Sequence, residues 1–198
     1  MTEYIQKHMI KQYPKHKKIF QKLGVLEKIK RRNIKLDEAI VRVIIGQMLS
    51  GKAAKTIYER VVELRDKRNF EVSWMLDTNE LNQCGVSKAK SKSINLFGKT
   101  VKDNPNLINS WRKMETTKLH NEISKFWGMG EWTASIITLF YLGREDVFPV
   151  NDGSLNKALD LIKIEEKNII YEIDPGKASP YRSYLALYLW KAIDTGLI

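Results

Sequence analysis

Cysteine is almost absent from this sequence. The single residue, Cys84, excludes a disulfide framework and a four-cysteine iron–sulfur cluster within the chain. Histidine is also scarce. His8, His16 and His120 lie far apart and lack the spacing of metal ligands, so solvated or capping roles are expected for them. We therefore expect no cofactor and no metal site built from side chains.

Long apolar runs are missing as well. None reaches the length of a transmembrane helix, and the first residues lack the apolar core of a signal peptide, so a soluble cytoplasmic protein is expected. Strand-like alternation, internal repeats and low-complexity tracts are also absent, whereas helical spacing recurs nearly throughout. The sequence therefore predicts an all-α fold, and 198 residues suffice for one large domain or two small lobes.

Positive charge is abundant. The chain has 34 Lys and Arg against 23 Asp and Glu, a net charge of +11. This balance favours a polyanionic partner such as nucleic acid, although a Lys-rich surface without such a partner would give the same composition.

Helical spacing is sharpest from residue 37 onward, after one or two short helices in residues 1–36. Asp37 is the expected N-cap of a helix that ends at Ser50-Gly51. A later helix begins at Ser87, with three lysines expected to face outward, namely Lys88, Lys90 and Lys92. The preceding turn, Gly85-Val86-Ser87, either contacts a phosphate or simply joins two helices.

The segment Phe126–Ala134 contains two glycines, Gly128 and Gly130, directly before an apolar helical run. Such a turn leaves the first N–H groups of the helix unpaired and brings bare backbone close to a ligand, which suits an anion. A phosphate of nucleic acid would fit a basic protein. A structural turn between helices explains the same pattern.

Five stretches in this order resemble the helix-hairpin-helix DNA glycosylases, and among them the alkylpurine branch called 3-methyladenine DNA glycosylase II. The likeness covers roughly residues 37–190, and its stretches are Ile44–Ser50, Gly85–Lys90, Gly128–Ala134, Val147–Asp152 and Pro180–Trp190. The resemblance implies two helical lobes with the hairpin at a cleft between them. One lobe would span residues 37–143, and the other would combine residues 1–36 with 144–198.

The resemblance also implies which residues bind DNA. Met48 stands where the family presents a wedge that fills the gap left by a flipped nucleotide, although a core methionine is the alternative. The other expected DNA contacts are Gln47, Gly128, Met129, Gly130 and Thr133. Backbone carbonyls of the hairpin hold a monovalent cation in many family members, which makes such a cation possible here.

Asp152 is the expected catalytic residue. An ionised carboxylate beside C1′ stabilises the positive charge that develops on the sugar when the glycosidic bond breaks. The alternative is that Asp152 merely caps the helix that follows, a role for which Asn151 competes.

The resemblance places Trp132 and Trp190 in the base pocket, where aromatic faces attract a cationic methylated purine, with Tyr184 or Tyr188 as further candidates. Core packing is the alternative for each aromatic residue. Lyase-competent relatives carry a lysine at position 132, so Trp132 implies base release without strand cleavage.

The chain departs from the family pattern at two positions and in one domain. Trp127 replaces the usual proline before the hairpin glycine, and Ile136 replaces an aromatic residue that some relatives place near the base. Residues 1–36 are expected to be mainly helical and cannot supply the N-terminal β-sheet domain of larger relatives. These departures bear on the substrate more than on the reaction.

The resulting hypothesis is a monomeric, monofunctional glycosylase that excises 3-methyladenine and 7-methylguanine from double-stranded DNA, in a bacterial or archaeal cytoplasm at the nucleoid. Two alternatives stay open. One is a glycosylase for neutral lesions such as uracil, hypoxanthine or a mismatched base, and the other is a non-catalytic helix-hairpin-helix DNA-binding protein.

Overall fold

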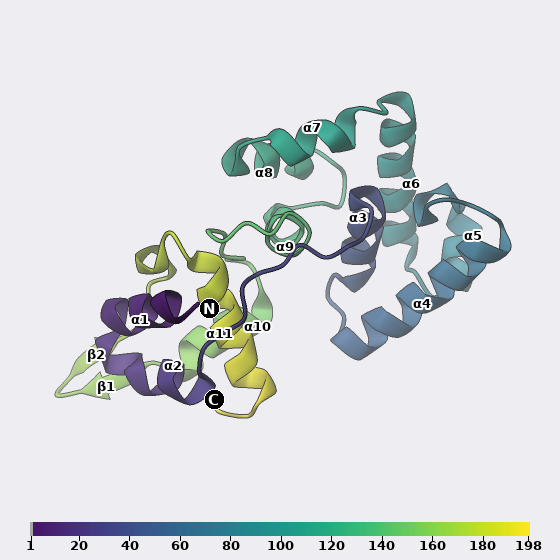
Figure 1. The fold of residues 1–198 in the computed structure, drawn as a ribbon. Coiled ribbons are helices and arrows are strands. Elements are labelled where there is room, and N and C mark those ends of the chain that lie inside the picture. Colours follow the sequence, from purple (N-terminus) through teal and green to yellow (C-terminus); the bar gives the residue numbers. More distant parts are fainter. Residues whose placement is uncertain (1) are drawn as a thin grey trace. The chain divides into compact units, whose positions relative to one another are not determined.

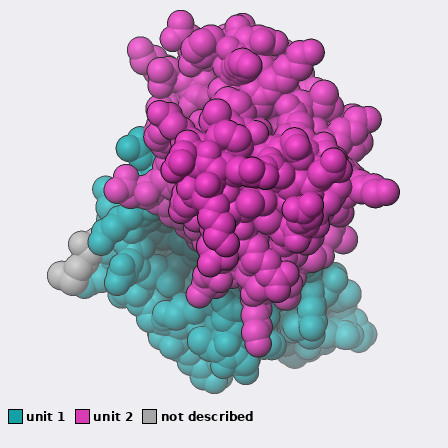
Figure 2. All heavy atoms as spheres, turned by 90° about the vertical axis from the view of Figure 1, so that its right-hand side faces the viewer, with its two compact units in different colours: residues 1–31, 138–198 teal, residues 32–137 magenta. Residues whose placement is uncertain are grey.

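The computed structural model describes residues 2–198 (Figure 1). The chain divides into two compact units, unit 1 with residues 1–31 and 138–198 and unit 2 with residues 32–137 (Figure 2). These boundaries lie five and six residues before those expected from the sequence, which follow residues 36 and 143. Helix α9 (Glu131–Phe140) spans the second boundary, because Leu139 near its end packs in the core of unit 1.

Unit 2 is built from helices. Its elements are α3 (Leu36–Gly46), α4 (Gly51–Lys67), η2 (Ser73–Met75), α5 (Thr78–Gln83), α6 (Lys88–Asp103), α7 (Leu107–Lys113), α8 (Thr116–Ser124) and most of α9. Helices α3 and α6 pack against each other, and α4 and α5 flank them. The side chains that this packing removes from solvent include Ile40, Ile44, Phe97, Trp111 and Ile123.

Unit 1 joins the two ends of the chain. Its elements are α1 (Glu3–Gln12), η1 (Pro14–His16), α2 (Lys17–Leu23), α10 (Gly153–Leu161), β1 (Ile164–Glu166), β2 (Ile169–Tyr171), η3 (Pro175–Ala178) and α11 (Arg182–Asp194). Helix α11 packs against α10 and α2, and its buried face supplies much of the core. The N-terminal helices therefore complete the unit that contains Asp152.

The expectation of an all-α fold is confirmed for the helices but misses one short hairpin. Strands β1 and β2 pair antiparallel, with Glu166 opposite Ile169. Lys167 and Asn168 form the turn with φ of 51° and 62°, the left-handed geometry of a two-residue hairpin loop. Three-residue strands are too short to show alternation, which explains why the sequence pattern gave no signal.

The predicted helix starts differ in their outcome. Ser87 caps α6 and accepts a hydrogen bond from the Lys90 N–H, as expected. Asp37 does not cap α3, because that helix begins at Leu36 and Asp37 lies in its first turn. The Asp37 carboxylate instead accepts the indole N–H of Trp74 at 3.3 Å. Over residues 2–198, no helix is long and apolar enough to cross a membrane.

Candidate active site

The turn between α3 and α4 carries the predicted wedge residue. Helix α3 ends at Gly46, two residues before Met48, whose φ of 56° lies in the left-handed region that residues with side chains seldom adopt. The Met48 side chain is 100% exposed. It is therefore not a core methionine, and it projects into solvent from the tip of the turn.

Gln47 connects this turn to the hairpin within unit 2. Its amide Nε2 donates to the Gly128 carbonyl at 2.9 Å and to the Thr133 hydroxyl at 3.0 Å. Thr133 is buried. The structure thus brings three predicted DNA-binding residues together. The side chains of Gln47 and Thr133 form hydrogen bonds that stabilise the hairpin.

The hairpin itself requires glycine at its first position. Gly128 has φ of 78°, and a Cβ built there would lie 2.9 Å from the Ser93 hydroxyl oxygen. That hydroxyl donates to the Trp127 carbonyl at 2.7 Å, so α6 approaches the hairpin backbone closely. Met129 is buried and its backbone N–H donates to the Phe126 carbonyl at 3.0 Å, so Gly128 and Gly130 are the better candidates for the DNA contact.

Aromatic and charged side chains surround the hairpin. Trp132 lies half-buried in the first turn of α9, and Trp127 is 48% exposed with the Lys92 ammonium 4.8 Å from its ring centre. Glu131 opens α9 and pairs with His120 Nδ1 at 2.6 Å. A carboxylate at a helix start competes with phosphate for the same N–H groups, and its pairing with His120 lessens that competition.

In unit 1, Asp152 caps α10. Its oxygen Oδ1 accepts from the backbone N–H groups of Ser154 and Leu155, at 3.1 and 2.9 Å, and from the Ser154 hydroxyl at 2.5 Å. The cap thus belongs to Asp152 and not to Asn151, its predicted rival. Capping fixes the carboxylate at the positive end of the helix, where its ionised form is stabilised.

Trp190 contacts the same carboxylate. Its indole N–H reaches Asp152 Oδ1 at 3.2 Å and the Ser154 hydroxyl at 2.9 Å, and its ring stacks on Phe140 with a centroid distance of 5.7 Å. Two residues predicted for the active site, 38 positions apart, therefore form one cluster in unit 1.

Tyr184 and Tyr188, on the same helix as Trp190, belong to the core. Both are buried, and their hydroxyls donate to the Glu145 carboxylate at 2.9 Å and the Gly24 carbonyl at 3.0 Å respectively. Burial raises the pKa of each tyrosine to about 12. The suggestion that they line a base pocket is wrong. Trp111, in unit 2, is also a buried core residue.

Some residues of these clusters were missed by the sequence analysis. Ser154 bridges Asp152 and Trp190, and its position two residues after a capping aspartate is a recognisable signal. Ser93 and Lys90 support the hairpin and the wedge turn from α6. No sequence signal identifies the roles of Ser93 and Lys90. Helical spacing alone predicts that the lysines of α6 face solvent.

The hairpin carbonyls already have donors. Phe126 O accepts from the Met129 N–H at 3.0 Å, Trp127 O from Ser93, and Gly128 O from Gln47. A monovalent cation bound here would share these oxygens with protein donors. Within residues 2–198, no group of three or more His, Cys, Asp or Glu side chains is arranged to hold a metal ion.

Residues 41–173, from the wedge turn through the hairpin to beyond Asp152, match the family model described as HhH-GPD superfamily base excision DNA repair protein. The chain belongs to this superfamily. Two curated relatives come from Schizosaccharomyces pombe. The alkylbase DNA glycosidase-like protein mag2 is 30% identical over 78% of this chain and 76% of its own length. DNA-3-methyladenine glycosylase 1 is 28% identical over 78% and 71%.

The fold is also that of a solved superfamily structure. The 3-methyladenine DNA glycosylase Mag1 of the same yeast, in complex with abasic DNA, aligns with a TM-score of 0.80 over 96% of this chain and 97% of its own. Sequence identity in that alignment is 20%, so it is the fold that is shared. Gln47, Met48, the Gly128–Gly130 hairpin and Asp152 lie within the residues that match the superfamily model, whereas Trp190 lies beyond them.

Proposed function

We propose that this protein is a DNA glycosylase that hydrolytically releases alkylated purines, 3-methyladenine and 7-methylguanine, from double-stranded DNA and leaves an abasic site. Membership of a base excision repair superfamily and the names of the two yeast relatives support this reaction and substrate. The observation that carries the proposal is the Asp152 carboxylate, fixed by Ser154, Leu155 and Trp190.

Each cluster has a defined part in the proposed reaction. The backbone N–H groups of Gly128 and Gly130 hold a DNA phosphate, a contact that positions the duplex without reading its sequence. Met48 enters the base stack and fills the gap behind the extruded nucleotide, at an unstacking cost of a few kcal/mol. Trp132 and Trp190 offer aromatic faces to the cationic base.

The bond changes balance without a cofactor. The glycosidic bond breaks, and its electron pair leaves with the base and neutralises the positive charge of the alkylated ring. The sugar becomes cation-like, and the Asp152 carboxylate stabilises it until water adds at C1′ and loses a proton to solvent. Position 132 offers no amine for a Schiff base, so the abasic strand stays intact.

We also infer the setting of the reaction. The +11 charge fits a monomer that binds chromosomal DNA in the cytoplasm, and such binding weakens steeply with salt. No cofactor is required.

The proposal is tested by base release from methylated duplex DNA, with wild type and Asp152→Asn compared. Asparagine caps helices as well as aspartate does, so this substitution removes the charge and keeps the cap. We expect release by wild type and a loss of at least about a hundredfold in the variant. Asp160→Asn is the matched control, because it removes the same charge from an exposed position of the same helix.

Other outcomes decide between the alternatives. Equal release by wild type and Asp152→Asn would reduce Asp152 to a helix cap. Release of uracil or hypoxanthine but not of methylated purines would identify a glycosylase for neutral lesions. DNA binding without release of any base would identify a non-catalytic DNA-binding protein.

A further inference from the structure

Helical spacing predicted that Lys90 faces solvent, but the structure turns its side chain toward the end of α3. Its ammonium donates to the Ile45 carbonyl at 2.9 Å and to the Gln47 carbonyl at 2.7 Å. The first carbonyl belongs to the last turn of α3 and the second to its C-cap, where helical carbonyls lack partners within the helix. Its neighbours Lys88 and Lys92 are exposed.

This contact is an unusual use of a lysine. The Lys90 side chain is half-buried, and burial lowers the pKa of its ammonium. Within residues 2–198 no carboxylate pairs with it. The positive charge of the ammonium is therefore stabilised by the two carbonyl oxygens and by the negative end of the α3 dipole. A charged donor shared by both carbonyls fixes the Ile45 and Gln47 peptide groups relative to each other.

The carbonyls that Lys90 holds define the turn that presents Met48. Met48 directly follows Gln47, and its backbone is left-handed at a φ of 56°. A fully exposed side chain makes no contact of its own that would keep this conformation. The turn is instead fixed from both sides, by Lys90 on the Gln47 carbonyl and by the hairpin on the Gln47 amide.

We propose that Lys90 is a positioning residue for the wedge, holding the Ile45 and Gln47 carbonyls so that Met48 is already set for insertion before DNA binds. The proposal rests on the proposed function only in treating Met48 as the wedge. A turn that is rigid in advance does not lose conformational freedom when the side chain enters the base stack. Lys90 would thus raise the fraction of bound DNA with an extruded nucleotide.

The test measures extrusion directly and not through base release. A duplex carries 2-aminopurine beside an abasic site, and its fluorescence rises when the wedge unstacks the neighbouring base. Lys90→Met removes the ammonium and keeps the aliphatic stem. We expect the equilibrium for unstacking to fall about tenfold, the effect of losing hydrogen bonds from a charged donor. Affinity for DNA should change less than that.

Four further variants show whether Lys90 acts through its donors and through Met48. Lys90→Arg keeps two donors and should restore most of the fluorescence change. Lys99→Met, an exposed lysine of the same helix, should behave as wild type. The double variant Lys90→Met/Met48→Ala should unstack no less than Met48→Ala alone, because a residue that acts only through the wedge has no effect without it.

Several results would overturn the proposal. If the losses of unstacking from Lys90→Met and Met48→Ala added up in the double variant, Lys90 would have a general structural role and would not act through Met48. A loss confined to DNA affinity, with a reduced dependence on salt, would make Lys90 a phosphate contact. Should Lys90→Met fail to fold, Lys90→Gln keeps an uncharged donor group and must show an intermediate loss of unstacking, and full unstacking by it would refute the role.

Failure of the proposed function is a separate result. Wild type that unstacks 2-aminopurine but releases no base would refute the glycosylase and leave the role of Lys90 standing. Wild type that releases base without any unstacking would refute the wedge and Lys90 together.

Discussion

Trp190 donates its indole N–H to Oδ1 of Asp152, the same oxygen that accepts the backbone N–H groups of Ser154 and Leu155. One carboxylate oxygen thus receives donors from the helix that it caps and from α11. Because hydrogen bonds to a carboxylate favour its charged form and fix its direction, this arrangement suits a group that has to remain ionised beside a developing positive charge.

Trp190→Phe separates the hydrogen bond from the aromatic face. Phenylalanine keeps the stacking on Phe140 but has no N–H for Asp152. We expect the single-turnover rate of base release to fall about tenfold, since one hydrogen bond to a charged group contributes about 1.5 kcal/mol. Trp190→Ala also removes the ring and should weaken selection of cationic bases. A wild-type rate in Trp190→Phe would show that the indole N–H plays no part.

The two hairpin glycines should respond differently to alanine. A Cβ at Gly128 would meet the Ser93 hydroxyl at 2.9 Å on a backbone with φ of 78°, so Gly128→Ala should lower both stability and DNA affinity. A Cβ at Gly130 meets nothing within 4 Å. Gly130→Ala should therefore unfold at the wild-type urea concentration yet bind DNA several-fold more weakly, because only the DNA backbone requires the space. Unchanged affinity of Gly130→Ala would place the phosphate elsewhere.

Local sequence signals predicted the local features of the site correctly. Ser87 caps α6, and Gly128 adopts the left-handed turn, because both outcomes depend on a few neighbouring residues. Met48 is exposed because it lies in the turn after α3. The sequence predicted that α3 ends at Ser50, four residues after its actual end at Gly46.

Long-range contacts were beyond the sequence. Lys90 points inward because carbonyls 45 and 43 positions away accept hydrogen bonds from its ammonium, and helical periodicity does not reveal such contacts. Within α11, Trp190 reaches Asp152 while Tyr188, two residues earlier, donates to the Gly24 carbonyl in the core. Both are aromatic residues of one helix, and only the packing of neighbouring elements decides which of them faces the carboxylate.

Gly98→Ala should destabilise unit 2 although alanine favours helices. Gly98 lies inside α6, and a Cβ there would come 2.6 Å from the Trp74 ring, whose indole N–H is held by Asp37. Overpacking costs about 1–3 kcal/mol, which exceeds the gain of about 1 kcal/mol in helix propensity. Urea unfolding measures the difference. Gly51→Ala, in the first turn of α4 with nothing within 4 Å, is the control and should not destabilise.

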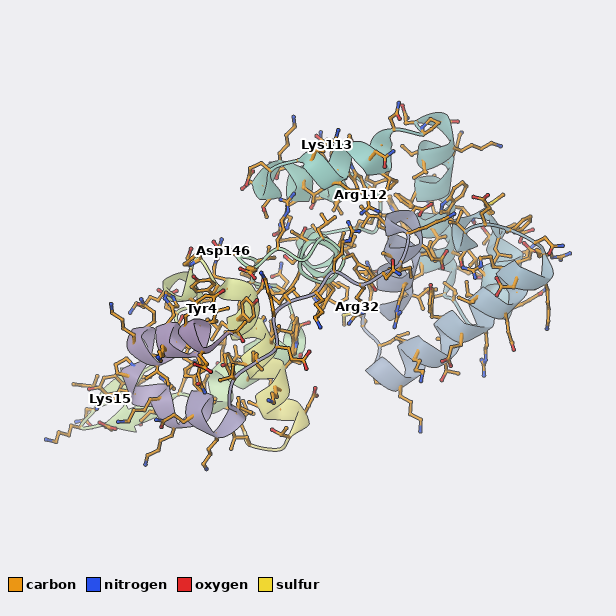
Figure 3. All side chains as sticks on the ribbon, viewed as in Figure 1. Tyr4, Lys15, Arg32, Arg112, Lys113 and Asp146 are labelled. Carbon is orange, nitrogen blue, oxygen red and sulfur yellow. The ribbon has the colours of Figure 1, made fainter. Side chains whose placement is uncertain are left out.

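Stability should depend on pH through Asp146, which is labelled in Figure 3. Burial acts to raise the pKa of this carboxyl, but hydrogen bonds from Arg182 and Ser179 outweigh burial and lower the pKa below its usual value. A carboxyl with a lowered pKa in the folded state stabilises the protein above the unfolded pKa of about 3.9, and this contribution is lost as the pH falls through the folded value. Arg182 begins α11, so the pair fixes the start of the helix that carries Trp190.

Asp146→Asn isolates this contribution. The pair is partly exposed and screened by solvent, so we expect the variant to be less stable than wild type by about 1 kcal/mol at pH 7. The difference should shrink below about pH 4 and vanish once Asp146 is protonated in the folded wild type. Urea unfolding at stepped pH measures it, with Asp194→Asn at the exposed end of α11 as the control of equal charge. If the difference in stability between wild type and Asp146→Asn were unchanged at pH 2.5, protonation of Asp146 would have removed no stabilising interaction. Asp146 would then stabilise α11 through uncharged hydrogen bonds alone.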